Sequence, residues 1–350
     1  MSSNTAHICV VGSLNIDFAV STSRCPGPGE TLTANSLSVT AGGKGANQAV
    51  ACGRASQTSS DASKVTVSMI GAVGADDVYY ATLIRPTLED SGVDTKYVEE
   101  KTDSRTGSAT IIVEDSAHGE NRILVVPGAN HAGMDDVSKI LATIQSYPQA
   151  PALIVLQGEI PRHTTLDLMR HFNQPGNQTH MLFNPAPVFA DGVPVDALSN
   201  TSVLVMNETE AVQMQASISP ESAISTQTTD ELKPEDLASQ FHALANVRIV
   251  LITLGAKGVF FSTRTGRKGF VAGVRVQKVV DTTAAGDTFV GYFAAAFAEF
   301  IATSAPLEEF DKTIEQAVRR ANCAAALCVQ RPGAMQSIPT ASEVDGLDSR

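Results

Sequence analysis

Two aspartates frame a run of small residues in V-D-T-T-A-A-G-D, which spans residues 280–287 and precedes an apolar stretch typical of a helix. Ala284, Ala285 and Gly286 permit a tight turn whose N–H groups point one way, beside the positive end of the following helix dipole. Such a turn can bind an anion, and Gly286 lets the backbone approach it closely. If that anion is a phosphoryl group in transfer, Asp287 can orient an attacking hydroxyl and accept its proton.

A plainer role stays open for both aspartates of this run. Asp is a favoured N-cap, and small residues before a helix are ordinary. Asp281 also suits a turn, where its side chain bonds the nearby backbone. The octapeptide alone favours this plainer role, so the other motifs of the chain must decide between the two.

A second glycine-rich turn, A-G-G-K-G-A-N-Q-A at residues 41–49, also precedes a predicted helix. It is not a P-loop, because Lys44 is followed by glycine rather than by Ser or Thr, and no G-x-G-x-x-G occurs in the chain. Gly42 and Gly43 let the backbone come close to a polar ligand, and Lys44 and Asn47 can donate to hydroxyls or to a phosphate. The alternative is a simple glycine-rich connection with an exposed lysine.

Asn15 and Asp17 follow the first apolar run, in G-S-L-N-I-D. They alternate, so both face one side if the chain stays extended. An amide that donates and accepts, beside a carboxylate that accepts twice, suits the hydroxyl groups of a sugar. A polar turn is the common alternative.

Other polar or flexible groups follow later apolar runs. Glu159 comes after L-I-V-L-Q-G, and T-L-G-A-K-G at 253–258 is a glycine turn suited to a base, to phosphates, or to a plain hairpin. Asn207 and Glu210 lie three apart, on one face of a predicted helix start. They could hold the water shell of Mg²⁺, although a capped helix start explains them as well.

Short apolar runs, each followed by a turn or polar residue, predict buried strands that position these groups. The runs are Ile8–Val11, Val65–Ile70, Leu153–Leu156, His180–Phe183, Val203–Val205 and Ile249–Thr253. Helix-like stretches such as Thr164–His171 and Glu235–Ala245 lie between several of them. This alternation predicts an α/β fold with a mostly parallel central sheet flanked by helices on both faces. In such folds ligands bind at the carboxyl ends of the strands.

Two regions interrupt the alternation with a period of two, residues 18–40 and 106–126, and predict a small antiparallel β lid. The α/β core then comprises 7–17, 41–105 and 127–340, all within one domain spanning 1–350. Ser/Thr-rich segments at 55–64 and 213–232 are predicted to be surface insertions, and the tail 341–350 to be loosely held.

Composition limits the classes of function. The chain has 350 residues, 43% of them hydrophobic and 18% charged, with a formal net charge of −12. This charge argues against general binding to nucleic acids or membrane surfaces. The five cysteines form no C-x-x-C pair and the N-terminus lacks a signal-peptide pattern, so we expect a cytoplasmic protein, with nuclear presence not excluded. The seven histidines show no metal-ligand spacing.

Taken together, the motifs resemble those of one family. V-V-G-S-L-N-I-D, P-G-P-G-E-T, A-G-G-K-G-A-N-Q-A-V-A-C-G-R, N-P-A-P, N-E-T-E, I-T-L-G-A-K-G and D-T-T-A-A-G-D occur in the order found in the ribokinase-like, phosphofructokinase-B type of carbohydrate kinases. The resemblance runs from about residue 7 to about residue 340, with the two insertions outside it. Within the family, G-G-K-G-A-N-Q-A together with N-I-D is typical of the members that act on ribose.

The resemblance implies ATP-dependent phosphorylation of the 5-hydroxyl of D-ribose, which gives ribose 5-phosphate and ADP. It implies Asp287 as the catalytic base, with Ala285 and Gly286 in the anion hole. Positions that match ribose contacts are Asn15, Asp17, Gly43, Lys44, Asn47 and Glu159. Positions on the nucleotide side are Asn207, Thr253, Gly255, Gly258, Gly286 and Asn322.

The resemblance also implies two cations and an assembly. Glu210 matches the Mg²⁺ and phosphate position. The ligands of an activating K⁺ would be Asp281, Thr283, Cys328, Arg331, Gly333 and Ser337, several of them through backbone carbonyls. Lid sheets of the family often pair into a homodimer, which suits residues 18–40 and 106–126.

One position departs from the family pattern, and other functions stay open. Tyr79 stands in G-A-D-D-V-Y-Y where glycine is usual, so the geometry of that loop is in question. A related kinase of another sugar or a nucleoside, such as deoxyribose or fructose, is the near alternative. A catalytically silent sugar-binding regulator would be expected to lack Asp287 or the glycines, and all are present. A dinucleotide-dependent dehydrogenase lacks its fingerprint here.

Overall fold

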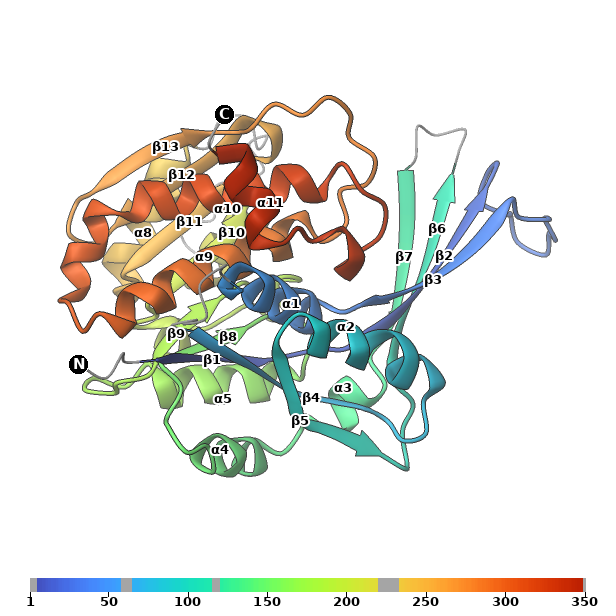
Figure 1. Cartoon of the computed structure of the whole chain (residues 1–350), viewed down its shortest axis with the longest axis horizontal. Helices are drawn as coiled ribbons and strands as arrows, with labels where there is room; N and C mark the ends of the chain where they lie inside the picture. The colour runs from blue at the N-terminus through green and yellow to red at the C-terminus, as the bar shows by residue number, and fades with distance from the viewer. Residues whose placement is uncertain (1–4, 58–64, 115–119, 220–232, 349–350) are drawn as a thin grey trace.

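A nine-stranded sheet forms the centre of the molecule (Figure 1). The structure is a computed structural model that describes residues 5–57, 65–114, 120–219 and 233–348. The strand order is β13-β12-β11-β10-β9-β8-β1-β4-β5. The bounds are β1 Ala6–Val11, β4 Val65–Gly74, β5 Val93–Lys101, β8 Leu153–Leu156, β9 His180–Phe183, β10 Val203–Asn207, β11 Ile249–Thr253, β12 Gly258–Thr263 and β13 Lys268–Ala272. Pairs from β5 to β11 are parallel, while β12 and β13 are added antiparallel at one edge.

Both faces of the sheet are buried, as the continuous apolar runs predict. In β1, Ile8 and Val10 pack into one hydrophobic cluster, while Cys9 and Val11 pack into a second cluster on the opposite face. The alternation follows from the period of two in a strand. The predicted α/β fold with helices on both faces is confirmed.

Helices cover the two faces in separate groups (Figure 1). The first face is covered by α1 Lys44–Ser56, the π-helix η1 Tyr80–Ile84, α2 Arg85–Asp90, α9 Ala285–Ala302, η6 Leu307–Lys312, α10 Ile314–Cys328, η7 Met335–Ser337 and α11 Ala341–Asp348. The second is covered by α3 Ala129–Ala132, α4 Val137–Gln145, α5 Arg162–Phe172, α6 Val195–Leu198, α7 Glu208–Ile218 and α8 Pro234–Ala245. A short 3₁₀ turn, η5 Gly255–Lys257, links β11 to β12.

Helix α9 is buried along most of its length because its sequence alternates alanines with phenylalanines. Gly291 lies against α1: a Cβ on this residue would lie 2.3 Å from the Cβ of Ala51 and 2.7 Å from the amide nitrogen of Cys52. The absence of a side chain therefore lets the two helices touch backbone to backbone. This contact fixes the N-termini of α1 and α9 relative to each other.

A second sheet of four strands stands beyond the main body, at the right of Figure 1. Its order is β3-β2-β6-β7, with β2 Asn15–Thr22, β3 Ser36–Gly42, β6 Gly107–Glu114 and β7 Glu120–Val126. The outer pairs are antiparallel, as predicted, whereas the central strands β2 and β6 run parallel because both leave the core in the same direction. Residues 23–35 of the predicted lid contain no helix or strand, and β2 begins at Asn15, earlier than predicted.

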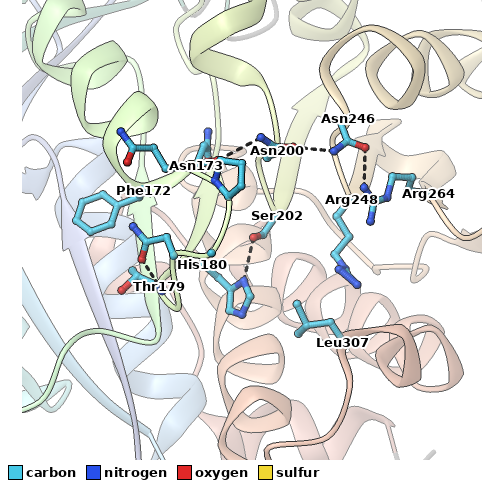
Figure 2. Close-up of a pocket in the computed structure, with 14 residues that line it drawn as sticks. Phe172, Asn173, Thr179, His180, Asn200, Ser202, Asn246, Arg248, Arg264 and Leu307 are labelled. Atoms are coloured by element: carbon cyan, nitrogen blue, oxygen red, sulfur yellow. Dashed lines mark hydrogen bonds between the residues drawn. The ribbon is translucent and has the colours of Figure 1, made fainter.

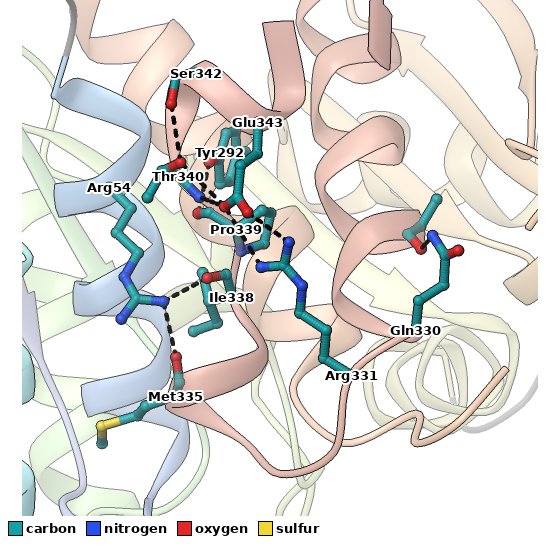
Figure 3. Close-up of polar contacts among 11 residues, drawn as sticks. Arg54, Tyr292, Gln330, Arg331, Met335, Ile338, Pro339, Thr340, Ser342 and Glu343 are labelled. Atoms are coloured by element: carbon teal, nitrogen blue, oxygen red, sulfur yellow. Dashed lines mark hydrogen bonds and ion pairs between the residues drawn. The ribbon is translucent and has the colours of Figure 1, made fainter. Parts of the chain in front are cut away.

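The C-terminal residues pack on the core, so the prediction of a loose tail at 341–350 is wrong for residues 341–348. Helix α11 places Val344 among fully buried core residues. Glu343 forms an ion pair with Arg331 at 2.6 Å, drawn in Figure 3. A helix of eight residues carries too few apolar positions for its period to be recognised in the sequence.

The two predicted insertions overlap regular helices. Ala55 and Ser56 belong to the last turn of α1, and residues 213–218 belong to α7, so those parts of the predictions are wrong. Residues 58–64 and 220–232 lie outside the described residues. Tyr79 packs edge-on against Phe18 of the lid, with ring centroids 5.9 Å apart. None of the helices in the described ranges is both long and apolar enough to cross a membrane.

Candidate active site

A cavity of about 520 Å³ lies where the carboxyl ends of the strands meet the base of the lid. Its walls include the start of α1, the turn before α9 and the polar residue that ends β10. Lid residues complete it: Ala109, Ile111, Ile123 and Val125. The predicted groups that share this cavity are Asn15, Asp17, Gly43, Lys44, Asn47, Glu159, Asn207, Glu210, Thr253, Thr283, Gly286 and Asp287. Motifs from distant parts of the chain therefore converge, as the parallel sheet predicts.

Asp287 lies in the first turn of α9 and is only 6% exposed. Each oxygen of its carboxylate accepts one hydrogen bond from α1. Asn47 Nδ2 donates to Oδ2 at 2.9 Å, and Gln48 Nε2 donates to Oδ1 at 2.9 Å. The carboxylate is thus held from one side, and it faces the cavity with lone pairs to spare.

The turn before α9 has the geometry of an anion site. Ala284 is the N-cap in a left-handed conformation, with φ of 60°, and Ala285 begins the helix. The first-turn N–H groups of Gly286 and Asp287 have no intrahelical acceptor, whereas the amide of Ala285 donates to the carbonyl oxygen of Thr282 at 3.3 Å. A Cβ on Gly286 would meet no protein atom within 4 Å, so open space lies directly over this turn. Oriented N–H groups, the helix dipole and this space together suit a phosphoryl group.

The sugar-side candidates are held by their neighbours. Asn15 Oδ1 accepts from Asn130 Nδ2 at 2.7 Å. Glu159 Oε2 accepts from the amide of Lys44 at 2.9 Å and from Ser13 Oγ at 2.5 Å. The glutamate therefore fixes the turn that begins α1.

Charge is crowded in this part of the cavity. Burial raises the pKa of Asp17 to about 7, with further rises from the carboxylates of Glu159 and Asp287 and an opposing effect of Lys44. The pKa of Lys44 is raised, chiefly by Asp287, although burial opposes this. The single ammonium group of Lys44 thus lies near the carboxylates of Asp17, Glu159 and Asp287. This excess of negative charge favours a ligand with neutral hydroxyl groups over an anionic ligand in this part of the cavity.

The nucleotide-side candidates line an adjoining, more apolar cavity of about 290 Å³. Thr253, Gly255, Gly258, Gly286 and Asn322 lie on its wall. Its apolar surface comes from residues such as Val259, Val274, Val279 and Phe289. The two cavities meet at their shared residues, Thr253, Thr282 and Gly286. An apolar slot that opens onto an anion turn suits a nucleotide whose base is buried and whose phosphates reach the turn.

Asn207 lies in the larger cavity rather than in the apolar slot. It forms a capping box with Glu210: the Glu210 amide donates to Asn207 Oδ1 at 2.8 Å, and the Asn207 amide donates to Glu210 Oε2 at 2.9 Å. Burial raises the pKa of Glu210, while Lys44 opposes the rise. A half-buried carboxylate beside the anion turn fits the donor set of Mg²⁺, which keeps several waters.

The six residues matched to a K⁺ site are joined in one hydrogen-bonded set, in which the amide of Arg331 donates to the carbonyl oxygen of Cys328 at 3.0 Å. Asp281 accepts from the amide of Thr283 at 2.9 Å and from the amide of Gly333 at 2.8 Å. Cys328 Sγ lies 3.6 Å from the carbonyl oxygen of Thr283 and 3.1 Å from Ser337 Oγ. Carboxylate, carbonyl and hydroxyl oxygens therefore gather beside the anion turn, a donor set that fits a hard monovalent cation.

Arg331 differs from the other five members of this set. Its guanidinium turns to Glu343 of α11, as Figure 3 shows, so only its backbone could serve a cation. In the same region, Arg54 of α1 donates to the carbonyl oxygens of Met335, at 3.1 Å, and of Ile338. The 331–340 segment is thus tied to α1 and to α11.

Several residues around the site are not assigned a role by their residue type or spacing. Gln48, Gln157 and Asn184 are buried and form a chain of amide hydrogen bonds that ends on Asp287. Gln48 and Asn184 lie within the motifs G-G-K-G-A-N-Q-A and N-P-A-P, but the sequence does not indicate that their side chains contact the site. Asn130 and Ser13 were missed as well.

A separate hollow of about 230 Å³ lies at the opposite edge of the sheet, near the amino ends of β9, β10 and β11 (Figure 2). Arg264 Nη1 donates to Asn246 Oδ1 at 2.6 Å, and Asn246 Nδ2 donates to Asn200 Oδ1 at 2.6 Å. His180 Nδ1 lies 3.1 Å from Ser202 Oγ. None of the predicted site residues lines this hollow.

Both the sequence and the structure are similar to those of known proteins. The chain matches the pfkB family of carbohydrate kinases over residues 5–341. It is 37% identical over 344 residues to a ribokinase of Schizosaccharomyces pombe, covering 97% of each chain. The structure of a ribokinase from Giardia lamblia is similar with a TM-score of 0.81 at 30% identity, covering 99% of each chain.

A ribokinase from Arabidopsis thaliana, solved in complex with ribose and ATP, is similar with a TM-score of 0.76 at 29% identity, covering 98% of each chain. The family match extends through all seven motifs and through both the main sheet and the lid. The chain belongs to the pfkB family of carbohydrate kinases.

Proposed function

We propose that the protein transfers the γ-phosphoryl group of ATP to the 5-hydroxyl of D-ribose, giving ribose 5-phosphate and ADP. One observation carries the proposal: Asp287 lines the polar cavity next to Gly286, which this cavity shares with the apolar slot, and open space lies over Gly286 at the helix N-terminus. The choice of ribose rests on the ribokinases that the chain resembles over nearly its full length.

The polar cavity would bind the sugar. Asn15 and Asp17 lie on the same face of β2 and reach its hydroxyls, while Lys44, Asn47 and Glu159 line the remaining wall. The lid residues Ala109, Ile111, Ile123 and Val125 cover the ring and exclude water. The adenine would occupy the apolar slot, with the phosphates directed toward Gly286.

In the reaction, the 5-hydroxyl oxygen attacks the γ-phosphorus as the bond to the β–γ bridging oxygen breaks. The hydroxyl proton passes to the carboxylate of Asp287, and ADP leaves with the electron pair of the broken bond. The N–H groups of the turn stabilise the charge on the transferred group. A weak base suffices because the alcohol proton can leave late in a loose transition state.

Two cations complete this proposal. Glu210 would hold Mg²⁺, which neutralises charge on the β- and γ-phosphates when bound. Asp281, Thr283, Cys328, Gly333, Ser337 and the backbone of Arg331 would surround K⁺, whose charge would stiffen the adjacent anion turn.

We further propose that the whole chain acts as one kinase domain and forms a homodimer through the lid. The face of the lid with Ile123 and Val125 carries apolar side chains that are 53% and 52% exposed. A second copy would cover them. We propose a cytoplasmic location, supported by the five cysteines, none of which forms a disulfide in the described residues.

The test is coupled ADP release with ATP·Mg²⁺ and a panel of D-ribose, 2-deoxy-D-ribose, D-fructose and a nucleoside, with and without K⁺. We expect release with D-ribose, increased by K⁺. Asp287→Asn should lower kcat by roughly 10²- to 10⁴-fold while sugar binding and folding persist. Release with another sugar alone would overturn the substrate, and full activity of Asp287→Asn would overturn the mechanism.

A further inference from the structure

Gln48 is completely buried in the second turn of α1, and its amide touches the carboxylate of Asp287. Asn47 lines the polar cavity, proposed to bind the sugar, whereas Gln48 lines neither this cavity nor the apolar slot proposed for the nucleotide. The two neighbours on α1 therefore differ: Asn47 can contact a substrate directly, whereas Gln48 can act only through the groups that it bonds.

The amide of Gln48 is fully engaged on both ends. Its Nε2 donates to Asp287 Oδ1 at 2.9 Å and to Asn184 Oδ1 at 3.0 Å. Its Oε1 accepts from Gln157 Nε2 at 2.9 Å. Gln157 follows β8 and Asn184 follows β9, so the ends of two core strands hold one side chain of α1.

A backbone carbonyl determines which end of each side-chain amide, the NH₂ group or the oxygen, faces its neighbour. Asn184 Nδ2 donates to the carbonyl oxygen of Val205 at 2.9 Å, and a carbonyl can only accept. Asn184 must therefore turn its oxygen toward Gln48, which must present its NH₂ group. That NH₂ group then also faces Asp287, and Oε1 is left for Gln157. The sheet thus dictates that Asp287 receives a donor at this position.

We propose that Gln48 is a positioning residue for the catalytic carboxylate, oriented by Gln157 and Asn184 so that Asp287 keeps one rotamer under the anion turn. The inference rests on the proposed role of Asp287. With one donor on each oxygen, from Asn47 and from Gln48, the plane of the carboxylate is fixed. One lone pair stays directed at the incoming hydroxyl, which is the geometry that proton transfer requires.

The first variant is Gln48→Met, which keeps the volume and removes both donors. A hydrogen bond to a charged group has a strength that corresponds to roughly 10- to 100-fold in rate, so kcat should fall by that factor. The KM values for D-ribose and ATP should stay within about twofold, because Gln48 lines neither cavity. The pH–rate profile should also change, because the carboxylate loses one of its two side-chain donors.

Gln48→Glu tests the charge directly. At low pH the new carboxyl is protonated and donates to Asp287, as the amide does. As pH rises, the two carboxylates repel each other. The activity of this variant relative to the unmodified protein should therefore be highest at the acid end and fall with pH, which a merely space-filling role would not produce.

Gln157→Met and the double variant test the orientation. Gln157→Met should lower kcat less than Gln48→Met does, and the double variant should lose no more than Gln48→Met alone. Gln215→Met is the matched control, since Gln215 is a buried glutamine of α7, 2% exposed, that donates to Gln240. It should leave kcat and the pH profile unchanged.

Asp287→Asn and the panel of sugars are assayed in the same experiment. Failure of the proposed function is thereby distinguished from failure of the proposal for Gln48. If the protein phosphorylates a different sugar, the Gln48 variants are assayed with that sugar. An unchanged kcat and pH profile in folded Gln48→Met would overturn the proposal. So would a lower kcat with the pH profile unmoved in both Gln48 variants. If Gln48→Met does not fold, Gln48→Glu and Gln157→Met decide by the same criteria.

Discussion

A Cβ placed on Gly42 would lie 2.1 Å from Oδ2 of Asp17. Gly42 ends β3 and pairs with Asn15, while Asp17 is two residues further along β2. The carboxylate thus rests on the bare backbone of the neighbouring strand. This contact explains why a glycine is needed one residue before the conspicuous turn that starts α1.

Gly42→Ala should push the Asp17 carboxylate out of position while leaving the nucleotide slot intact. The KM for D-ribose should rise by roughly 10- to 100-fold, which corresponds to the loss of a charged hydrogen bond, and the KM for ATP should change little. Steady-state kinetics with each substrate varied would measure both. Gly346→Ala, where a Cβ meets no atom within 4 Å, is the control. An unchanged KM for the sugar would contradict the role of Asp17.

Two glycines of α9 should respond in opposite ways to alanine. Gly286→Ala fits the protein, since no protein atom lies within 4 Å of the added Cβ, but the methyl group enters the space over the anion turn. We expect an unchanged or higher Tm and a loss of kcat of about tenfold or more. Gly291→Ala should lower the Tm because its Cβ collides with α1. Thermal unfolding and ADP release on both variants check this, and a fully active Gly286→Ala would remove the anion site.

Asp17 should lower the stability of the protein as pH rises from about 4 to about 7, opposite in sign to the buried histidines His7, His180 and His242, whose pKa values are lowered by burial. The pKa of this buried carboxyl is raised to about 7, so the folded state holds its proton over a range where the unfolded chain has released it. Ionising the group in the fold then costs up to about 4 kcal/mol of unfolding free energy. Denaturant unfolding across this range should show that the stability of Asp17→Asn rises with pH relative to that of the unmodified protein. Parallel curves would show that Asp17 does not titrate in this way.

Removing the charge of Asp281 should abolish a specific response to K⁺. Thermal unfolding in KCl and in tetramethylammonium chloride at equal ionic strength measures binding without activity. The unmodified protein should be more stable in KCl, and Asp281→Asn should show no difference. Asp345→Asn is the control, since it removes a carboxylate that pairs with Arg320, outside the K⁺ set. A K⁺ response that persists in Asp281→Asn would place the cation elsewhere.

The two faces of the lid should differ in their effect on assembly. Ile123 and Leu124 are adjacent on β7 and 53% and 67% exposed, but they point to opposite faces. Only Ile123 lines the sugar cavity. Ile123→Asp should convert a dimer to a monomer in light scattering, and Leu124→Asp should not. The reverse result would assign the interface to the other face.

Much of the fold follows from sequence patterns because the strands are buried on both faces. The apolar runs predict β8, β9 and β11 to the residue, since a polar or turn residue ends each of them. The lid strands are predicted with less accurate ends, because half-exposed strands have weaker patterns. The parallel pairing of β2 with β6 has no sequence signal at all, since strand direction depends on where each strand leaves the core.

The residues of the candidate site also fall into those that the sequence predicts and those that it does not. Residues on glycine turns and strand ends, such as Asp17, Lys44 and Asp287, are recognisable because their types contrast with their neighbours. Gln48 and Gln157 are not recognisable, because a polar residue in a helix or after a strand normally faces solvent. Only the tertiary structure shows that these amides are buried and that their hydrogen bonds lead to Asp287.

The strands of the lid have one further consequence. Asn15 and Asp17 are not placed at the foot of a separate flap: they are the first residues of β2, which continues without a break in register to Ser21 opposite Ser36. β6 joins the same sheet at Gly107, beside Asn15. The lid strands and the two polar residues therefore belong to one continuous hydrogen-bonded sheet. A displacement of the outer strands would therefore also displace the side chains of Asn15 and Asp17. Opening of the lid and loss of the proposed sugar contacts would then occur together.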